Sequence, residues 1–559
     1  MNGKIVLGAI LTLLSISMLT LTFDIQPVKS DPAMWIVDDD GPADFHTIQE
    51  AINSLYVKDG DTILVEEGIY YENVLVNKSI SLVGESRSST VIDGSRNEFV
   101  IDIVADGTVI DNFTMQNGQF GIRALYQVVG PLSSCSIARN DISNCTYGMY
   151  MLGENHSVDS NRIANCSAAM RARVIANSTI VDNLIVNNSE GLYFWGTNNT
   201  FRNNTMIDNY FNFGQYSYDA AYHEPVTQYV NNIDTSNTIN GKPIYYWIDV
   251  HNKEVPADAA YVELINCTNI TVSNLTLSSN LGSIILINSK NCTLEDLNTN
   301  QSGFGIVIAN NSTDNIIKNN SIELWPYPAS SGIFLSFSEN NSIQGNNIQM
   351  VMHLKASWGL WLLHADNNHI SRNVVSEFDT GVRLDNAHNN LFYHNSFINN
   401  TDQVFAPHPT VNDIWDDGYP SGGNYWTDHV TVDDYSGVNQ DEYGSDGIVD
   451  EPYIIDDYNQ DNYPLMEPWA PLPRTMSELK SEIEELGSKG EIDNQGIVNS
   501  LIAKLNAAQK LVDKGKIDEA KSILEEDFIP QIQNLSGIHI TMEAADILIE
   551  SAEYILSHL

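Results

Sequence analysis

The chain has 559 residues, of which 72 are Asp or Glu and only 27 are Lys or Arg, so its formal net charge at pH 7 is −45. This excess of negative charge argues against a nucleic-acid partner, whose phosphates the protein would repel, and it suits a solvated protein in a cation-rich exterior. Five Cys residues are too few for a scaffold built on disulfides.

The N-terminal segment, residues 1–30, has the pattern of an export signal. Lys4 precedes an apolar run from Ile5 to about Leu21, and the segment ends near Ser30 in a loose match to a small-residue cleavage site. An uncleaved membrane anchor is the alternative, because the apolar run is long enough to span a bilayer. We expect a secreted or cell-surface protein, with the membrane as a partner only if this segment is retained.

Residues 31–85 are expected to cap one end of the fold and to supply its first strands. The sequence predicts an amphipathic helix that places Phe45, Ile48, Ile52 and Leu55 on one face. A helical lid is expected there because an uncovered first strand would leave an open sheet edge that invites aggregation.

A repeat of roughly 22 residues organises residues 86–409. Its short apolar runs, separated by Asn, Ser, Thr and Gly, predict strands and turns. One unit cannot bury its own apolar face, so we expect a mainly β fold, a right-handed parallel β-helix of about a dozen coils. The recurring Asn should stack at one corner, adopt the left-handed turn conformation and hydrogen-bond to its copies. It falls at Asn140, Asn161, Asn183, Asn204, Asn320, Asn346, Asn373 and Asn395.

The opening of this array resembles pectin-lyase-like β-helix proteins in its TIQEAI, GIYYENV and SISLVGE segments. Together with the NNxI coils, it resembles the NosD-type family of exported archaeal and bacterial proteins. Pectin methylesterases share a similar opening, but their catalytic motifs of the DFIFG and LGRPW type do not occur in this chain. The resemblance therefore implies the fold and export, and it does not imply esterase activity.

The NosD resemblance implies copper handling as one alternative function. Several imidazole, carboxylate and thioether side chains fall in neighbouring coils and could supply ligands of suitable softness. Their spacing is irregular and polar turns favour His in any case, so copper is not the expected cofactor. These residues are Met350, Met352, His353, His364, Asp366, His369, His388 and His394.

Residues 210–262 interrupt the array with a segment dense in Tyr. Insertions that project from a rigid repeat scaffold often carry binding sites. The alternative is a side flap that packs on the rod through its aromatic residues.

The middle residue of the triplet that follows the recurring Gly suggests a binding face. Alternate strand residues face opposite ways, so this residue should face solvent when its apolar neighbours face inward. Aromatic rings suit stacking on sugars, and Arg suits the carboxylate or sulfate of an acidic polysaccharide. The alternative is a stripe that packs under another part of the chain or stacks on itself. The predicted binding residues are Arg123, Tyr150, Arg171, Tyr193, Phe334, Trp361 and Arg383, with Val307 at the equivalent position of one further coil.

A polysaccharide lyase, epimerase or hydrolase is the enzymatic alternative, and it would need a poised base beside carboxylates or a convergent carboxylate pair. Asp141 and Arg162 follow stacked Asn residues and are expected to form an exposed ion pair. The segment Trp426–His429 resembles a pectate-lyase motif, but it lies outside the repeats. We predict no catalytic residue.

Two pairs of Cys residues recur at matching positions of neighbouring repeats. Cys145 and Cys166 are 21 residues apart, and Cys267 and Cys292 are 25 apart, all in NCT or NCS contexts. Stacked at the spacing of adjacent strands, each pair would be within reach of a disulfide. Buried thiols that act as small apolar groups are the alternative. Cys135 has no such counterpart.

Residues 410–470 form an acidic tail that resembles the closing segment of NosD-type proteins. Its residues in part match the pattern of a twelve-residue Ca²⁺ loop, although Tyr443 and a final Asp in place of Glu depart from that pattern. A bound Ca²⁺ would order this charged loop. The candidate ligands are Asn439, Asp441, Asp446 and Asp450.

Residues 475–559 change to a helical period and predict a bundle of about four helices. KLNAAQKLVDKGKIDEAKSILEEDFIPQI and ITMEAADILIESAEYIL resemble the FIMAH domain of exported proteins. The bundle is expected to tether the rod or to bind a cell-surface protein. Asn-x-Ser/Thr sequons such as those at Asn77, Asn144, Asn165 and Asn198 predict some glycosylation. Overall, the sequence favours a non-catalytic surface protein that binds a polysaccharide or other surface glycan.

Overall fold

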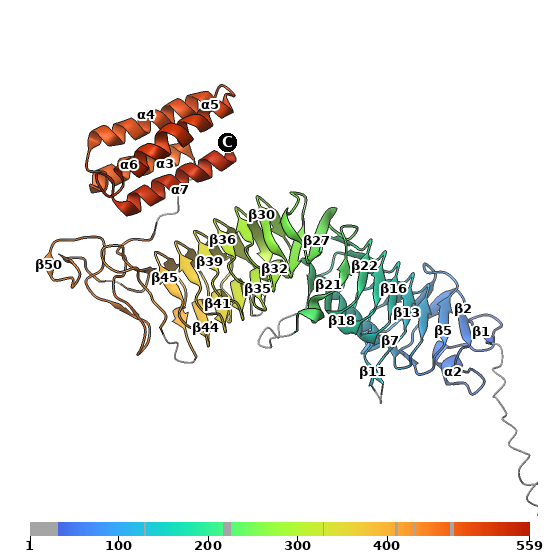
Figure 1. The fold of residues 1–559 in the computed structure, drawn as a ribbon. Coiled ribbons are helices and arrows are strands. Elements are labelled where there is room, and N and C mark those ends of the chain that lie inside the picture. The colour runs from blue at the N-terminus through green and yellow to red at the C-terminus, as the bar shows by residue number, and fades with distance from the viewer. Residues whose placement is uncertain are drawn as a thin grey trace, which may run out of the picture.

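The computed structural model describes residues 32–127, 130–215, 225–327, 329–407, 412–429, 431–469 and 475–559. The predicted signal segment, residues 1–30, and part of the predicted insertion, residues 216–224, lie outside these ranges. In the ranges described, no helix is long and apolar enough to cross a membrane. The fold is an elongated, bent rod of β-strands with a helical bundle at its C-terminal end (Figure 1).

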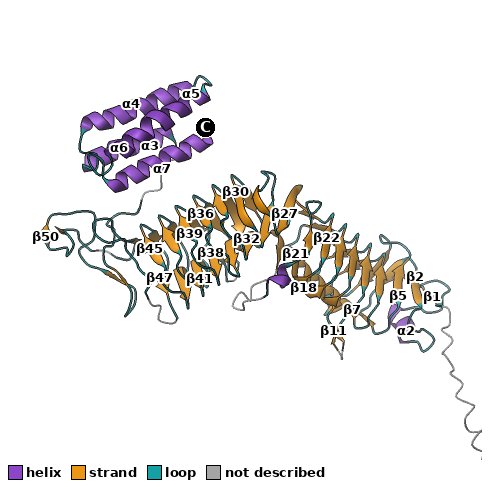
Figure 2. Ribbon diagram, in the orientation of Figure 1, coloured by secondary structure: helices purple, strands orange, loops and turns teal. Residues whose placement is uncertain are grey.

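The first half of the rod is a parallel β-helix in which each strand pairs with the equivalent strand of the next coil (Figure 2). One sheet consists of β1 (Met34–Val37), β2 (Thr62–Val65), β5 (Ser81–Gly84), β8 (Val109–Asp111), β13 (Ser136–Ala138), β16 (Ser157–Asp159), β19 (Thr179–Val181), β22 (Thr200–Arg202) and β25 (Asn232–Ile233). The second consists of β4 (Val74–Val76), β7 (Phe99–Ile103), β10 (Phe120–Ala124), β15 (Tyr147–Glu154), β18 (Ala168–Ala176), β21 (Glu190–Thr197) and β24 (Phe211–Gln215). The short hairpin of β11 (Tyr126–Gln127) and β12 (Gly130–Pro131) projects from this half.

A third sheet of 16 strands runs through both halves of the rod. In the first half it contains β3 (Gly68–Tyr70), β6 (Thr90–Asp93), β9 (Thr114–Gln116), β14 (Asp141–Ser143), β17 (Arg162–Ala164), β20 (Leu184–Val186), β23 (Thr205–Ile207) and β26 (Thr238–Ile239). It continues in the second half with β27 (Lys242–Ile248), β29 (Tyr261–Ile265), β32 (Gly282–Ile287), β35 (Phe304–Ala309), β38 (Ser331–Ser336), β41 (Trp358–Leu363), β44 (Thr380–Asp385) and β47 (Asp402–Phe405).

Two further parallel sheets complete the second half of the rod. The first consists of β28 (His251–Glu254), β30 (Thr268–Ser273), β33 (Thr293–Glu295), β36 (Ile316–Lys318), β39 (Ser342–Gln344), β42 (His369–Ser371) and β45 (Leu391–Tyr393). The second consists of β31 (Thr276–Ser278), β34 (Asn298–Ser302), β37 (Ser321–Leu324), β40 (Asn347–Met350), β43 (Val374–Ser376), β46 (Ser396–Ile398) and β48 (Tyr425–Trp426).

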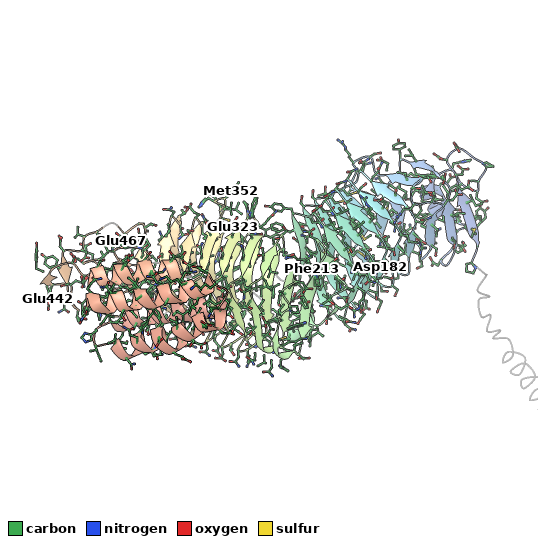
Figure 3. The ribbon with its side chains drawn as sticks, turned by 90° about the horizontal axis from the view of Figure 1, so that it is seen from above. Asp182, Phe213, Glu323, Met352, Glu442 and Glu467 are labelled. Atoms are coloured by element: carbon green, nitrogen blue, oxygen red, sulfur yellow. The ribbon has the colours of Figure 1, made fainter. Side chains whose placement is uncertain are left out.

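The two halves meet at a joint made largely by the segment that the sequence marks as an insertion. The 3-10 helix η1 (Val226–Tyr229) precedes β25 and β26, which extend two sheets of the first half, and β27 then turns back antiparallel to β26. Alternate residues of β29 face different cores, because Tyr261 packs in the first core while Val262 packs in the second. The outer face of the second half therefore closes the end of the first, and Phe213 lies where they meet (Figure 3).

The N-terminal end is capped by α2 (Ile48–Asn53), whose N-cap residue Thr47 accepts a hydrogen bond from the backbone N–H of Glu50. Ile48 and Ile52 are buried, as predicted, but Leu55 is 84% exposed. The prediction for Leu55 was wrong because the helix ends at Asn53, so Leu55 no longer follows the helical period.

The C-terminal end of the rod is closed by the acidic tail. Trp415 stacks on Phe392 with ring centroids 4.2 Å apart, and Trp426 stacks on Phe397 at 4.6 Å, so both Trp rings cover the end of the second core. The tail also contains two antiparallel hairpins. These are β49 (Tyr435–Ser436) with β50 (Glu442–Tyr443), and β51 (Tyr453–Ile454) with β52 (Gln460–Asp461).

The C-terminal bundle has an apolar core of its own. A capping box between Thr475 and Glu478 begins its first helix. Arg372 of the rod forms an ion pair with Glu550 of the bundle at 2.6 Å. The helices are α3 (Met476–Lys489), α4 (Gln495–Val512), α5 (Ile517–Ser522), the π-helical η2 (Ile523–Phe528), α6 (Ile529–Leu535) and α7 (Met542–His558).

Ladders of buried Asn side chains connect the coils. The Oδ1 atom of Asn183 accepts from both the backbone N–H and the side-chain amide of Asn161, at 3.0 and 3.1 Å. The Asn183 side chain then donates to Oδ1 of Asn204 at 3.0 Å and back to the carbonyl of Val158 at 3.0 Å. Each amide thus satisfies buried polar groups on both neighbouring coils, which pins the register of the stack.

The recurring Asn does not take the left-handed turn conformation that the sequence predicted for it. The residue before it does, for example Asp182 at φ 55° before Asn183 and Asn203 at φ 53° before Asn204. The physical reason is that the ladder residue must point inward to reach its copies, so the chain reverses one residue earlier.

We predict that Asn183→Ala lowers the free energy of unfolding by at least about 2 kcal/mol, because it leaves buried groups of two neighbouring coils without hydrogen-bond partners. Thr179→Ala is the matched control, because Thr179 is an exposed residue of the neighbouring strand β19. This variant should lower the free energy of unfolding by less than about 1 kcal/mol. Chemical denaturation of both variants measures the difference. Equal losses would contradict the role of the ladder.

The joint contains a buried carboxyl group. Glu263 is 0% exposed, Tyr261 donates its hydroxyl to Oε2 at 2.7 Å, and Oε1 has no hydrogen-bond partner among the described residues. Burial raises the pKa of Glu263 from its ordinary 4.5 to about 8. The folded protein therefore keeps a proton that the unfolded chain has lost between these two pH values.

We predict that stability falls as pH rises from about 4.5 to 8, since the folded state binds more protons than the unfolded state in that window. Glu263→Gln cannot titrate and should flatten this part of the profile. Thermal unfolding at several pH values compares the two proteins, and an unchanged slope in the variant would contradict this assignment.

Candidate functional site

An open groove of about 1390 Å³ runs along one corner of the first half of the rod and reaches Ser279 and Gln301 of the second half. It lies where the chain turns from the sheet of β14, β17, β20 and β23 into the sheet of β15, β18, β21 and β24. Each coil contributes one residue with positive φ at this corner, a conformation that Asn and Asp tolerate better than most residues. These corner residues are Asn117, Asn144, Asn165, Asn187, Asp208 and Asn240.

Asn240 is followed by Gly241 and the exposed Lys242, but at the other five corners the two residues after the corner residue have different tasks. The first points inward, as Asn188 does, whose backbone N–H and side-chain amide donate to Oδ1 of Asn209 at 2.9 Å each. The second lines the groove with an uncharged polar or aromatic side chain. These second residues are Gln119, Thr146, Ser167, Ser189 and Tyr210.

Aromatic rings flank the groove at both ends. Phe120 and Tyr147 directly follow two lining residues and stack on each other, with ring centroids 5.0 Å apart and an interplanar angle of 14°. They are in register on β10 and β15, and both are half-buried. At the other end Tyr210 meets Trp325, which follows β37 of the second half, edge to face at 6.1 Å. Rings half in solvent can stack on the faces of a bound ring.

The predicted binding stripe is in register but is divided by the joint. Arg123, Tyr150, Arg171 and Tyr193 are paired in order across β10, β15, β18 and β21. The equivalent positions of the second half are paired in the same way, but on the 16-stranded sheet. They are Val307, Phe334, Trp361 and Arg383.

Two stripe residues do not face solvent, contrary to the prediction. Tyr193 is 1% exposed because it packs against Phe211 and Leu281, and Phe334 is 2% exposed because it packs against Phe304 and Leu363. The bend of the rod and the aromatic neighbours cover these rings, which periodicity within a single strand does not reveal.

The stripe arginines are paired with carboxylates of the chain itself. Arg123 binds Asp102 at 2.7 Å and also binds Glu98, and these contacts raise the pKa of Arg123 above its ordinary value. Arg171 forms an ion pair with Glu190 at 2.5 Å. These internal partners neutralise the cations that the sequence analysis assigned to an acidic ligand.

The second part of the stripe forms a packed aromatic cluster. Trp361 stacks on Phe334 at 4.3 Å and donates its indole N–H to Asp385 at 2.7 Å. Arg383 binds the same Asp385 at 2.6 Å and lies over the ring of Trp358 at 4.7 Å. This arrangement corresponds to the self-stacking alternative.

Of the four candidate Ca²⁺ ligands, Asn439 and Asp441 lie in the hairpin of β49 and β50, and Asp446 and Asp450 lie in the segment between the two hairpins of the tail. The Asp450 carboxylate accepts from the backbone N–H groups of Asp434 and Tyr435, at 3.1 and 3.0 Å, and Asp446 accepts from the N–H of Ile448 at 3.1 Å. Asn439 and Asp441 are exposed. These carboxylates order turns, and in the described part of the chain Asp441, Asp446 and Asp450 do not form a group of three close ligand atoms.

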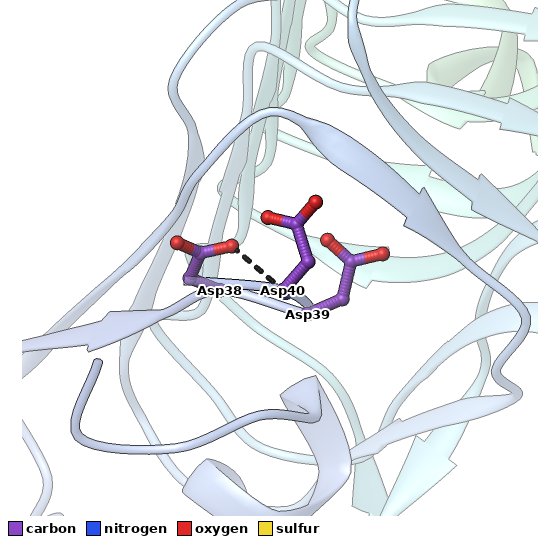
Figure 4. Close-up of side chains that lie close together, drawn as sticks. All are labelled: Asp38, Asp39 and Asp40. Atoms are coloured by element: carbon purple, nitrogen blue, oxygen red, sulfur yellow. Dashed lines mark hydrogen bonds between the residues drawn. The ribbon is translucent and has the colours of Figure 1, made fainter. Parts of the chain in front are cut away.

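One acidic cluster occurs elsewhere in the described part of the chain. Ligand atoms of Asp38, Asp39 and Asp40 all lie within 4.8 Å of one another, and it is the one such group of His, Cys, Asp and Glu found there (Figure 4). Asp39 and Asp40 are exposed, and Asp38 accepts from the backbone N–H of Asp40 at 3.2 Å.

The histidines considered for copper are engaged in packing. His394 stacks on Trp469 at 3.9 Å with its Nε2 atom 2.8 Å from the carbonyl oxygen of Ser421, and burial lowers the pKa of His394 to about 4.

Most of the other candidate copper ligands also have contacts of their own. His369 stacks on Tyr393 at 5.2 Å. His364 stacks on Phe337, and Asp366 accepts from the N–H of His388. Met350 is buried, Met352 is 64% exposed, and His353 contacts Thr401.

The motifs weighed for catalysis have structural roles. Asp141 and Arg162 form the expected ion pair at 3.0 Å, with both side chains partly exposed. Trp426 is buried in the closing tail, and His429 contacts the carbonyl oxygen of Glu451 at 2.8 Å.

All five Cys residues are buried and free, so the structure favours the thiol alternative for both stacked pairs. Cys145 and Cys166 occupy inward ladder positions beneath the groove, and their thiols donate to the carbonyl oxygens of Ser143 and Ala164. Cys135 is buried against the carbonyl oxygen of Ala105.

We predict that a thiol-reactive dye labels none of the five Cys residues in the native protein and all five after denaturation, because burial protects the thiols and raises the pKa of Cys135 and Cys292 to about 11. Absorbance of the released dye counts the thiols. Three reactive thiols in denaturant would instead indicate a disulfide.

Sequence reasoning missed the groove. The signal that could have found it is the recurrence of an exposed Asn or Asp followed by one inward and one outward residue, as in NGQ, NCT, NCS, NNS and DNY. The matching contexts of Cys145 and Cys166 put the sequons Asn144 and Asn165 at one position of the coil, but the sequence alone does not reveal that the turn there leaves an open groove.

Comparisons with known proteins agree with this architecture. Residues 99–253 match the family model of the right-handed β-helix region, residues 226–431 match the model of the periplasmic copper-binding protein NosD, and residues 476–557 match the FIMAH domain. The fold is thus a right-handed parallel β-helix with a C-terminal helical domain, and the family resemblance predicted from the sequence is confirmed.

Individual relatives are more distant. A stretch of 101 residues is 37% identical to a cell surface glycoprotein of Methanothermus fervidus, and it covers 18% of this chain and 16% of that protein. The A-module of the Azotobacter vinelandii mannuronan C-5 epimerase AlgE4 has a TM-score of 0.32 and 14% identity, over 65% of this chain and 94% of that chain. Pectin methylesterase from carrot has a TM-score of 0.21 and 14% identity, over 55% and 81% of the two chains. Likenesses this weak carry no inference about activity.

Proposed function

We propose that this protein is an exported cell-surface protein that holds a polysaccharide chain in the corner groove of its first half. The observation that carries the proposal is the groove itself, an open channel of about 1390 Å³ lined by stacked side chains of the same kind and flanked by aromatic rings. A polymer of like units is the ligand that a repeating surface fits best, because each coil can meet one unit of the ligand in the same way.

The location follows from several observations. The N-terminal segment has the pattern of an export signal, the net charge of −45 keeps the rod solvated, and one stretch of the chain is similar to a cell surface glycoprotein. The C-terminal bundle is held to the rod by the Arg372–Glu550 ion pair and has a core of its own, so it is suited to tether the rod or to bind a surface protein.

Polar and aromatic groups have separate parts in binding. Asn side chains at the corner offer both a donor and an acceptor, which suits the hydroxyl groups of sugars. Tyr147 and Tyr210 supply partly exposed apolar ring surface at different points along the groove, against which the carbon faces of sugar rings can pack. The stripe residues Tyr150 and Arg171 then support the groove wall, and Tyr150 meets the ring of Tyr147 edge to face at 5.5 Å.

Copper handling and catalysis gain less support. In the described part of the chain, the candidate histidines do not form a group of three converging ligands, and their rings are packed against aromatic neighbours. The carboxylates next to the groove, Asp102 and Glu190, are occupied by Arg123 and Arg171.

We predict that Tyr147→Ala and Tyr210→Ala each weaken binding of the polysaccharide about fivefold, since one aromatic contact contributes on the order of 1 kcal/mol. Tyr443→Ala is the matched control, because Tyr443 is 93% exposed and lies in the tail. Affinity electrophoresis in gels containing each polysaccharide measures the loss. An equal loss for all three variants, or none, would overturn the assignment to the groove.

A further inference from the structure

We infer that the groove selects a neutral polysaccharide, extended along the rod with one sugar ring for each coil, in place of the acidic polysaccharide that the stripe arginines suggested. This inference rests on the proposed function and adds the chemical class and the direction of the ligand. It is carried by the charge and the spacing of the lining residues.

The lining has no net charge. Its charged members are Arg96, before the first corner, and Asp208, at the fifth, so one cation and one anion lie at opposite ends of the groove. The positions between them are amides, hydroxyls, thiols and glycine. Such a surface can both donate and accept hydrogen bonds, and it has no cluster of cations that would bind a row of carboxylates.

The cations beside the groove are compensated within the chain. Arg123 is shared between Asp102 and Glu98, and Arg171 is held by Glu190, with only 19% of each Arg side chain exposed. To bind an anionic sugar, either Arg would have to leave a formed ion pair. The chain as a whole carries a net charge of −45, so a polyanion would also approach against the long-range field.

The spacing fixes the direction of the ligand. Equivalent corner residues repeat once per coil, at the separation of adjacent strands, about 4.8 Å. A pyranose ring linked through its opposite ends has nearly the same length. A chain that runs parallel to the rod axis can therefore place each ring beside one corner residue and one second residue, for example Asn165 and Ser167. The six corners provide room for about six rings.

The aromatic residues agree with this register. Phe120 and Tyr147 belong to adjacent coils and stack face to face, so together they present apolar ring edges over two coils. Tyr210 lies three coils beyond Tyr147 and is held edge to face by Trp325 across the joint. The chain would thus meet partly exposed aromatic rings near each end and hydrogen-bonding groups between them.

The test uses the full-length protein, produced without N-glycosylation because Asn144 and Asn165 are sequons, and isothermal titration calorimetry. Neutral β-1,4-linked gluco- and manno-oligosaccharides of two to ten rings are compared with oligogalacturonate and oligomannuronate, each at low and high NaCl. We expect at least tenfold tighter binding of a neutral series. Its affinity should rise up to about six rings, then level off, and change less than twofold with salt.

A groove variant shows where each ligand binds. Ser167→Trp places a bulky ring in the middle of the groove and should reduce binding at least tenfold, while Thr179→Trp on the exposed face of β19 should not. Binding only of the acidic series, lost on Ser167→Trp and weakened by salt, would overturn the neutral class and leave the groove function standing. Binding that Ser167→Trp does not affect, or no binding by any of these oligosaccharides, would overturn both.

Discussion

The structure depends on the in-register stacking of equivalent residues, and the buried Asn ladders enforce that register. Each ladder amide accepts from one coil and donates to another, so a slip by one residue would break the bonds of every coil at once. The last residue of a ladder only has to accept hydrogen bonds, and a carboxylate does so. This explains why two ladders end at Asp413 and Asp461. Asp413 accepts from Asn390, and Asp461 accepts from the N–H of Asn424 at 2.7 Å.

The same register produces the surface on which function is proposed. The ladder residue points inward, so the residue before it makes the turn and the residue after it starts the next strand. Repeated along the rod, this local geometry aligns like side chains in columns and leaves the open groove at one corner. Trp325 of the second half reaches back to Tyr210 of the first, and the groove crosses the joint to Ser279 and Gln301 of the second half. Architecture and binding site therefore have one common cause.

Much of the fold could be predicted from the sequence. The spacing of Asn183 and Asn204 identifies the coil, the apolar period after Arg474 identifies the bundle, and the resemblance to NosD-type and FIMAH proteins agrees with the family models. These features are local or strictly repeated, so a single chain reveals them.

The site could be predicted less well, because it depends on contacts between distant parts of the chain. The sequence indicates that Tyr193 and Phe334 lie on outward strand positions, but it does not reveal that Leu281 and Leu363 cover them. It likewise identifies Arg123 as a cation without revealing that Asp102, 21 residues earlier, already binds it. The joint has no repeated pattern, which is why its strands resembled an insertion.

The most direct test of this account is a crystal structure of the protein with a neutral oligosaccharide of six rings. The account predicts a single chain in the corner groove, parallel to the rod axis, with rings beside the stacked Phe120 and Tyr147 and beside Tyr210. A ligand bound instead over Trp361 and Arg383, or across the coils at any angle to the axis, would contradict it.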